Sequence, residues 1–265
     1  MNKEELLKII AEESGMSVEE IAGVFTNEEK GERMIFKRNQ VINQLQKICT
    51  EINSSFDEVY KDEFKRISSE LSEILPIMFV GYQDALKNND ELLITCGDLI
   101  RNSSNTIIAA VQTLRCGFRL QSGILLRSVI EMCATVVHLI VKPEDLKAFL
   151  NDELKSTYSI SVANKQIPLF GRAWGILSKK QIHINSIHTE WYPLKKFEGK
   201  SEIPTEVTLG VIGLVTVILR ITTELTYYSN VDEHTYWKSA GENKVAFISP
   251  TDDAINWIKE KLDDK

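Results

Sequence analysis

Residues 121–141, QSGILLRSVIEMCATVVHLIV, decide the fold of this chain. They contain no proline. Apolar residues occupy almost every face of the helix that they would form, which is typical of a helix buried in a protein core. Residues 205–228, TEVTLGVIGLVTVILRITTELTYY, have the same character. Two buried helices need other helices around them. We therefore expect an all-α protein, a helical bundle of about four core helices.

The composition agrees with long helices and limits the classes of function. The 265 residues include only 13 glycines and 6 prolines, about 7% of the chain against an average of roughly 12%. The formal net charge of −7 does not suit a protein that wraps around nucleic-acid phosphates. The four cysteines form no C-x-x-C pair, so we expect buried, reduced thiols. They are Cys49, Cys96, Cys116 and Cys133.

Neither the N-terminus nor the most apolar segment of the sequence indicates a membrane protein. The first residues, Met-Asn-Lys-Glu-Glu, lack the apolar run of a signal peptide. The best candidate span, Val207 to Leu219, is about 13 residues long and ends at Arg220, which is too short to cross a bilayer. We expect a cytoplasmic protein that makes no membrane contact.

Residues 1–30 predict a small acidic helical hairpin, with helices over 3–12 and 17–25. Ser17 and Glu20 have the spacing of a capping box, and Ala11, Gly15 and Ile21 have that of a helix-turn-helix. This segment carries eight acids and three lysines, whereas a DNA-reading helix needs a basic surface. DNA binding is therefore disfavoured, and a capping or partner-docking hairpin is favoured.

The rest of the chain divides into three further regions. Residues 31–90 predict long amphipathic helices that pack on the bundle, with a break near 53–55 or at Tyr60; a coiled-coil dimer arm is an alternative. Residues 91–232 predict the bundle itself, with helices over 92–115, 121–141, 144–165, 173–183 and 205–228. Residues 233–265 predict a tail with a lone strand over 245–249 and a helix over 251–262.

One polar ridge interrupts the apolar helix at 121–141. Arg127, Glu131, Thr135 and His138 fall on one side of it, because the steps of four and seven residues return to nearly the same face. Charges on so apolar a helix need partners. The ridge is therefore either a buried site, with Arg127, Glu131 and His138 as catalytic candidates, or an ion pair that orients helices beside a hydrogen-bonded histidine.

Two other features are candidates for ligand binding. Arg220 and Glu224 repeat the i, i+4 pair on the second apolar helix, and Trp174 and Ser178 precede two histidines. His183 and His188 are candidate acid–base groups, but their spacing of five does not suit a helical metal pair, so we expect no metal. No phosphate-loop, dinucleotide-binding or hydrolase motif occurs, and we expect no cofactor.

Residues 90–230 resemble the HEPN group, nucleotide-associated helical bundles found in bacterial toxin–antitoxin and antiphage systems. The similar residues are Leu125-Leu126-Arg127-Ser128 with Glu131, then Leu177-Ser178 with His183 or His188 downstream, then the late apolar helix. Active members of the group cleave RNA with an R-N-x-x-x-H motif. Here Arg101-Asn102 is followed by Thr106 at the histidine position, and threonine lacks the acid–base chemistry of imidazole.

Two functions follow from this resemblance and from the missing histidine. The favoured one is a non-catalytic helical interaction module in bacterial defence or stress response, which binds a protein partner or forms a homodimer. The alternative is a divergent ribonuclease or nucleotide-modifying toxin, which acts on RNA through Arg127, Glu131 and a loop histidine.

Overall fold

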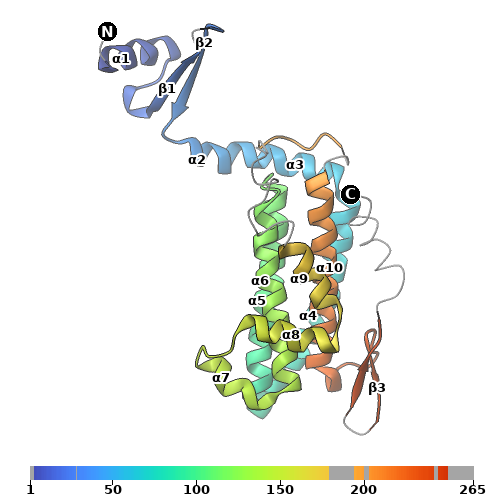
Figure 1. Cartoon of the computed structure of the whole chain (residues 1–265). Helices are drawn as coiled ribbons and strands as arrows, with labels where there is room; N and C mark the ends of the chain where they lie inside the picture. Colours follow the sequence, from blue (N-terminus) through green and yellow to red (C-terminus); the bar gives the residue numbers. More distant parts are fainter. Residues whose placement is uncertain (1–2, 28, 179–193, 200–202, 242–243, 250–265) are drawn as a thin grey trace.

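The computed structural model of the chain describes residues 3–27, 29–178, 194–199, 203–241 and 244–249. Most of these residues are helical, and the described strands form two short antiparallel pairs. The all-α prediction is therefore confirmed. Figure 1 shows three regions: a long helical bundle, a helical arm across one end of it, and a small N-terminal unit beyond the arm.

Four long helices build the bundle and run alongside one another (Figure 1). They are α4 (Lys61–Asn88), α5 (Glu91–Arg115), α6 (Gln121–Val141) and α10 (Ile203–Thr226). Helix α6 begins and ends at the predicted residues. The side chain of Asp90 caps α5 by accepting a hydrogen bond from the Leu93 amide at 3.0 Å.

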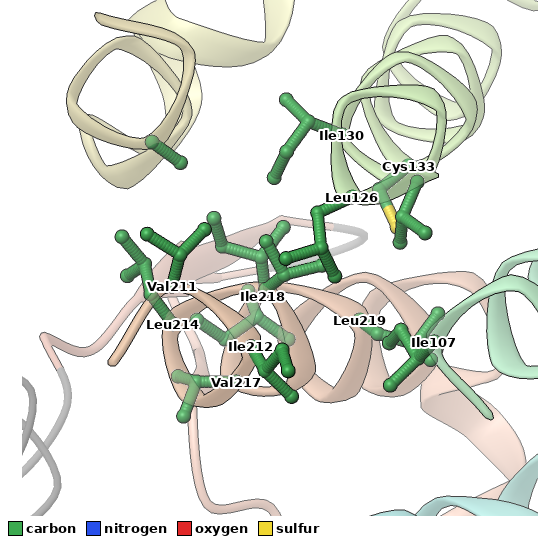
Figure 2. Close-up of a cluster of buried hydrophobic side chains, with 14 of the residues drawn as sticks. Ile107, Leu126, Ile130, Cys133, Val211, Ile212, Leu214, Val217, Ile218 and Leu219 are labelled. Carbon is green, nitrogen blue, oxygen red and sulfur yellow. The ribbon is translucent and has the colours of Figure 1, made fainter. Parts of the chain in front are cut away.

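The core of the bundle lies where α6 and α10 meet, with α5 beside them. Figure 2 shows Leu126 of α6 pointing toward Ile218 of α10, and Ile107 of α5 beside Leu219. All four side chains are fully buried. Because each buried aliphatic side chain of this size contributes about 1.5–3 kcal/mol, the packing of α6 against both α5 and α10 is a large part of the stability of the bundle.

Two glycines let α4 and α5 approach the end of α10. A Cβ atom on Gly81 of α4 would lie 2.1 Å from the Tyr227 ring, and one on Gly97 of α5 would lie 2.3 Å from the Tyr227 hydroxyl. That hydroxyl donates to the Leu93 carbonyl at 3.2 Å. Burial raises the pKa of Tyr227 well above its usual value.

A second layer of shorter helices covers α6. The predicted helix over 144–165 is wrong, because the chain turns between η3 (Pro143–Asp145), α7 (Leu146–Leu150) and α8 (Ser156–Gln166). Asp152 in this turn has a left-handed backbone, with φ of 60°. The next helix, α9 (Leu169–Leu177), starts earlier than predicted, and residues 179–183 lie outside the described residues.

The N-terminal unit, residues 3–37, differs from the prediction. Helix α1 (Lys3–Ser14) forms, but the second helix is wrong: the Ser17 capping box begins only the single turn η1 (Val18–Glu20). The chain then enters β1 (Ile21–Asn27), which pairs antiparallel with β2 (Glu32–Lys37). β-branched and aromatic residues along 21–26 favour a strand. The helix-turn-helix prediction is therefore wrong.

The N-terminal unit has a small core of its own. A register shift between Ile21 and Gly23 turns Ile21 to the same face of the hairpin as Val24. Together with Ile35 of β2, these side chains pack against Ile10 and the rest of α1. This cluster is separate from the core of the bundle.

The arm, residues 40–59, joins this unit to the bundle. It is one run of helical turns composed of α2 (Gln40–Asn43), the π-helical turn η2 (Gln44–Ile48) and α3 (Cys49–Val59). It ends at Tyr60, one of the two predicted break points. The end of the arm is fixed to the bundle by Arg115 of α5, which donates two hydrogen bonds to the Asp57 carboxylate at 2.8 and 2.5 Å.

After α10 the chain forms the turn η6 (Tyr228–Asn230) and a second hairpin. The strand predicted over 245–249 is β4 (Val245–Phe247), and it pairs with β3 (Trp237–Ser239), which the sequence did not predict. The indole of Trp237 donates to the Ile221 carbonyl at 2.8 Å and so ties this hairpin to α10. The helix predicted over 251–262 lies outside the described residues.

Two described helices, α6 and α10, are long and apolar enough to cross a membrane. Within α10, 94% of the most apolar window is buried inside the protein, and within α6 the share is 56%. Core helices of soluble proteins pass the same test of length and composition, so these two helices are weak support for a membrane span.

Candidate functional site

The candidate residues fall into three polar groups in different parts of the bundle. The first group joins α6 to α9. Arg127 Nε donates to Glu131 Oε1 at 3.0 Å, as the spacing predicts, and the guanidinium lies 4.2 Å from the centre of the Trp174 ring. Both charged side chains are about 30% exposed. Ser178, the fourth candidate in this part of the chain, follows the last turn of α9.

The second group joins the other end of α6 to α8. His138 is fully buried, and its Nε2 lies 2.8 Å from Asp145 Oδ2 while its Nδ1 lies 3.0 Å from Ser159 Oγ. Since the carboxylate accepts, Nε2 carries the proton and Nδ1 accepts from the Ser159 hydroxyl in the neutral ring. The ring also packs edge-on against Tyr158. Both nitrogens of His138 are therefore used to hold the turn after α6 and the start of α8.

The first two groups do not form one site. His138 follows Arg127 by eleven residues, which is about 16 Å along a helix. Its hydrogen-bond partners come from η3 and α8, whereas Arg127 contacts α9. Thr135 bonds back to the Glu131 carbonyl of its own helix at 2.9 Å. The other two histidines of the predicted site, His183 and His188, lie outside the described residues.

The third group joins α10 to α4 and to the chain before β3. Arg220 lies 3.4 Å from Glu224 Oε1 and also pairs with Glu73 at 2.5 Å and Glu70 at 3.6 Å. Burial alone would lower the pKa of Arg220, but these carboxylates raise it above its usual value. Glu224 is 1% exposed and accepts from the backbone amides of Thr235 and Tyr236 at 3.2 and 2.9 Å.

The two Arg–Glu pairs are thus independent. Within the described part of the chain, Arg127 of the first pair contacts α9, while Arg220 and Glu224 contact α4 and residues 235–236. Each pair orients neighbouring elements. Arg101 at the position of the HEPN motif is also used locally, because it pairs with Asp98 at 3.2 Å on the surface of α5.

The prediction missed a fourth polar group, next to the arm. Arg119 lies in the short turn between α5 and α6, is buried, and has its guanidinium 4.5 Å from the centre of the Phe197 ring. Its Nη1 donates to the Gly117 carbonyl at 3.0 Å, and its own carbonyl accepts from Thr208 of α10 at 3.3 Å. A charged residue in the five-residue turn between two buried helices is the one signal in the sequence that could have indicated it.

The cysteines lie as predicted for reduced thiols. Cys49, Cys96 and Cys133 are buried, and Cys116 is half-buried. Burial raises the pKa of Cys96 and of Cys133 to about 12, and burial together with the neighbouring Cys116 thiol raises the pKa of Cys49 to about 11. Among the described residues no three His, Cys, Asp or Glu side chains are grouped so as to hold a metal ion.

A different kind of surface lies on the N-terminal unit and the arm. Of the 19 large apolar residues that are exposed in the described ranges, eight lie within residues 3–48. Seven of them fall between positions 25 and 48 and are 41–68% exposed: Phe25, Met34, Phe36, Val41, Ile42, Leu45 and Ile48. The amphipathic helices predicted over residues 31–90 were expected to pack on the bundle, and for Val41, Leu45 and Ile48 this prediction is wrong, because these side chains are exposed.

Comparison of the chain with protein-family models, with curated proteins and with solved structures gives no match. The resemblance to the HEPN group therefore depends on the residues quoted above. The chemistry of the four polar groups and the exposed apolar side chains are the features that bear on function.

Proposed function

We propose that this protein is a non-catalytic helical interaction module that binds a protein partner through its N-terminal unit and arm. One observation carries the proposal: seven large apolar side chains are exposed between positions 25 and 48. Apolar patches of more than a few hundred Å² on a folded protein are typical of interaction sites. Half-exposed side chains of this size each leave on the order of 100 Å² accessible, so the three that share one face of the hairpin, Phe25, Met34 and Phe36, together leave a few hundred Å².

The polar groups of the bundle support the same conclusion. Arg127, Glu131, Arg220, Glu224 and His138 each have a partner inside the chain, and all of them except Glu131 contact a second element or segment of the fold. A ribonuclease that works through Arg127, Glu131 and His138 would need them around one substrate. The resemblance to the HEPN group favours bacterial defence or stress response in the cytoplasm as the setting.

Site-specific photo-crosslinking in the producing cell tests this proposal. A photoreactive amino acid replaces Phe25, which is 57% exposed, and a control replaces Gln83, an exposed polar residue of α4. We expect protein adducts from position 25 and none from position 83. Adducts to RNA alone would favour the nuclease alternative, and the absence of any adduct from position 25 would overturn the proposal.

A further inference from the structure

Two of the four cysteines lie next to each other where the arm meets the bundle. Cys49 is the first residue of α3, and Cys116 directly follows α5. The Cys49 thiol donates to the Cys116 carbonyl oxygen at 3.8 Å, although 67 positions of the chain separate the two residues. A Cβ atom on Gly117 would lie 3.4 Å from Ile52 Cγ2, so the contact between the two segments continues along the next turn of α3. The fold itself therefore holds these two thiols together.

The two thiols differ in their access to solvent. Cys49 is 3% exposed, and Cys96 and Cys133 are fully buried. Cys116 alone among the four cysteines is only half-buried. An oxidant dissolved in water therefore reaches Cys116 most easily, because the reactivity of a cysteine depends on its exposure.

A chain of hydrogen bonds from the arm directs a donor at the Cys116 sulfur. Gln112 Nε2 donates to Cys116 Sγ at 3.2 Å, and Gln112 Oε1 accepts from Arg115 Nη1 at 2.7 Å. Arg115 is held in turn by the Asp57 carboxylate. Since the arginine takes the carbonyl end of the Gln112 amide, its NH₂ group faces the sulfur. This donor supports negative charge on Cys116, against the field at the C-terminal end of α5.

The Cys49 thiol keeps its proton as long as Cys116 is reduced. Burial raises the pKa of Cys49 to about 11, and the hydrogen bond with Cys116 and the charge on that sulfur add to the effect. A sulfenic acid on Cys116 carries no such charge. Oxidation of Cys116 thus removes one of the causes that hold the proton on Cys49, beside the sulfur that Cys49 would attack.

We propose that Cys116 is an oxidation site for hydrogen peroxide, and that Cys49 converts the sulfenic acid formed there into a disulfide within the chain. In the first step the Cys116 thiolate attacks one oxygen of the peroxide and the O–O bond breaks. The sulfur becomes a sulfenic acid, and the other oxygen takes up a proton and leaves as water. This modification involves neither the exposed apolar side chains nor a partner protein, so it goes beyond the proposed function.

In the second step the Cys49 sulfur attacks the Cys116 sulfur. The S–S bond forms, the S–O bond breaks, and the hydroxyl group leaves as water with the proton of Cys49. The peroxide has then gained two electrons, and the two thiols have lost two. A thiol reductant restores both cysteines by thiol–disulfide exchange.

The disulfide joins the start of α3 to the end of α5 by a covalent bond. In the reduced chain the Arg115–Asp57 pair fixes the other end of α3, and Cys49 directly follows the π-helical turn η2. Because the bond links positions 67 apart, it restricts the unfolded chain and should raise the Tm by about 5–10 °C. Oxidation thus fixes the arm to the bundle at both ends of α3.

The test treats the full chain with hydrogen peroxide and measures its mass, then alkylates the free thiols with iodoacetamide and maps the peptides. We expect a mass about 2 Da below that of the reduced chain and one linked pair of peptides, which contains Cys49 and Cys116. Cys96 and Cys133 should be alkylated as in the untreated chain. Dithiothreitol should reverse the change in mass and the rise in Tm.

Three variants assign the roles of the two thiols. Cys49→Ser should stop the reaction at the sulfenic acid of Cys116, which dimedone traps. Cys116→Ser should slow the oxidation of thiols at least about tenfold, since the remaining thiols are buried. The matched control is Cys96→Ala, which removes a buried thiol of α5 and should leave the disulfide unchanged. Circular dichroism checks that each variant is folded.

Several results would overturn the inference. They are an unreacted Cys116, a sulfinic acid on Cys116 beside a free Cys49, and a disulfide between the Cys116 residues of two molecules. A linked pair that lowers the Tm would do the same, because the two thiols would then meet only in a distorted fold. The peptide map of the wild type decides these questions even if a variant does not fold.

Discussion

In the bundle, α10 buries nearly every side chain along its 24 residues, whereas seven large apolar side chains of the N-terminal unit and arm are exposed. The polar groups differ in the same way. Those of the bundle join pairs of elements, as Arg220 joins α10 to α4, while the N-terminal unit carries its charges on the surface. The bundle is therefore organised around its own core, and the N-terminal region is organised around a surface that remains to be covered.

The largest expected difference in the free energy of unfolding is between substitutions of a glycine in the bundle and a glycine in the hairpin. In the bundle, Gly81→Ala places a Cβ atom 2.1 Å from Cγ of the Tyr227 ring and 2.7 Å from Tyr227 Cβ. We expect it to lower the free energy of unfolding by about 4 kcal/mol, because neither helix can move away without opening the core. In the hairpin, a Cβ atom on Gly23 meets nothing within 4 Å, and Gly23→Ala should change stability by less than about 0.5 kcal/mol. Urea unfolding measures both, and equal effects would break the comparison.

The next effect distinguishes the two ion pairs. Glu224 is 1% exposed and accepts from two backbone amides, so Glu224→Ala leaves both amides without their acceptor and removes one of the three carboxylates around Arg220. We expect a loss of about 3 kcal/mol in the free energy of unfolding. Glu131 is 31% exposed, and Glu131→Ala should cost less than about 1 kcal/mol. If the two losses measured by urea unfolding are equal, the buried carboxylate does not have the structural role assigned to it.

An alkaline measurement tests the burial of the thiols in the bundle. Burial raises the pKa of the Cys133 thiol to about 12, above the roughly 8.5 of an unfolded cysteine. The stabilisation by the neutral thiol is thus fully present below about pH 8.5 and is lost as the pH rises toward 12. Between about pH 8 and 10.5, Cys133→Ala should lose about 2 kcal/mol less stability than the wild type. Equal losses in Cys133→Ala and in the wild type, measured by urea unfolding over this pH range, would contradict the burial of this thiol.

The features that were predicted correctly are those whose sequence pattern lies within one long continuous segment. Helix α6 was placed to the residue because its 21 mostly apolar residues lie between Gly117 and Pro143. The Arg127–Glu131 pair was predicted because the helix itself brings residues four apart together. The contact of Arg127 with Trp174 could not be predicted, since it depends on how α9 packs on α6.

The wrong predictions occur where a short sequence motif competes with contacts to a segment elsewhere in the chain. The Ser17 capping box forms as predicted, yet it supports one turn, because the residues from Ile21 onward gain more by pairing with β2. Val41, Leu45 and Ile48 have the spacing of a buried helix face, but spacing alone does not reveal whether the chain itself or a partner covers that face. Whether a stripe is covered is a property of packing, which the single sequence does not contain.

Removal of the whole N-terminal unit is the largest change to the chain, yet it is expected to have the smallest effect on the free energy of unfolding. A chain that begins at Arg38 lacks the whole N-terminal unit, whose core is separate from that of the bundle. The bundle keeps its four helices and the Arg115–Asp57 pair that fixes the arm, so its free energy of unfolding should fall by less than about 1 kcal/mol. Loss of the cooperative thermal transition would instead show that residues 3–37 belong to the folding unit of the bundle. Because Phe25, Met34 and Phe36 are removed with the unit, the truncated chain should bind a protein partner more weakly while it keeps the fold, and this separates the surface that binds from the core that folds.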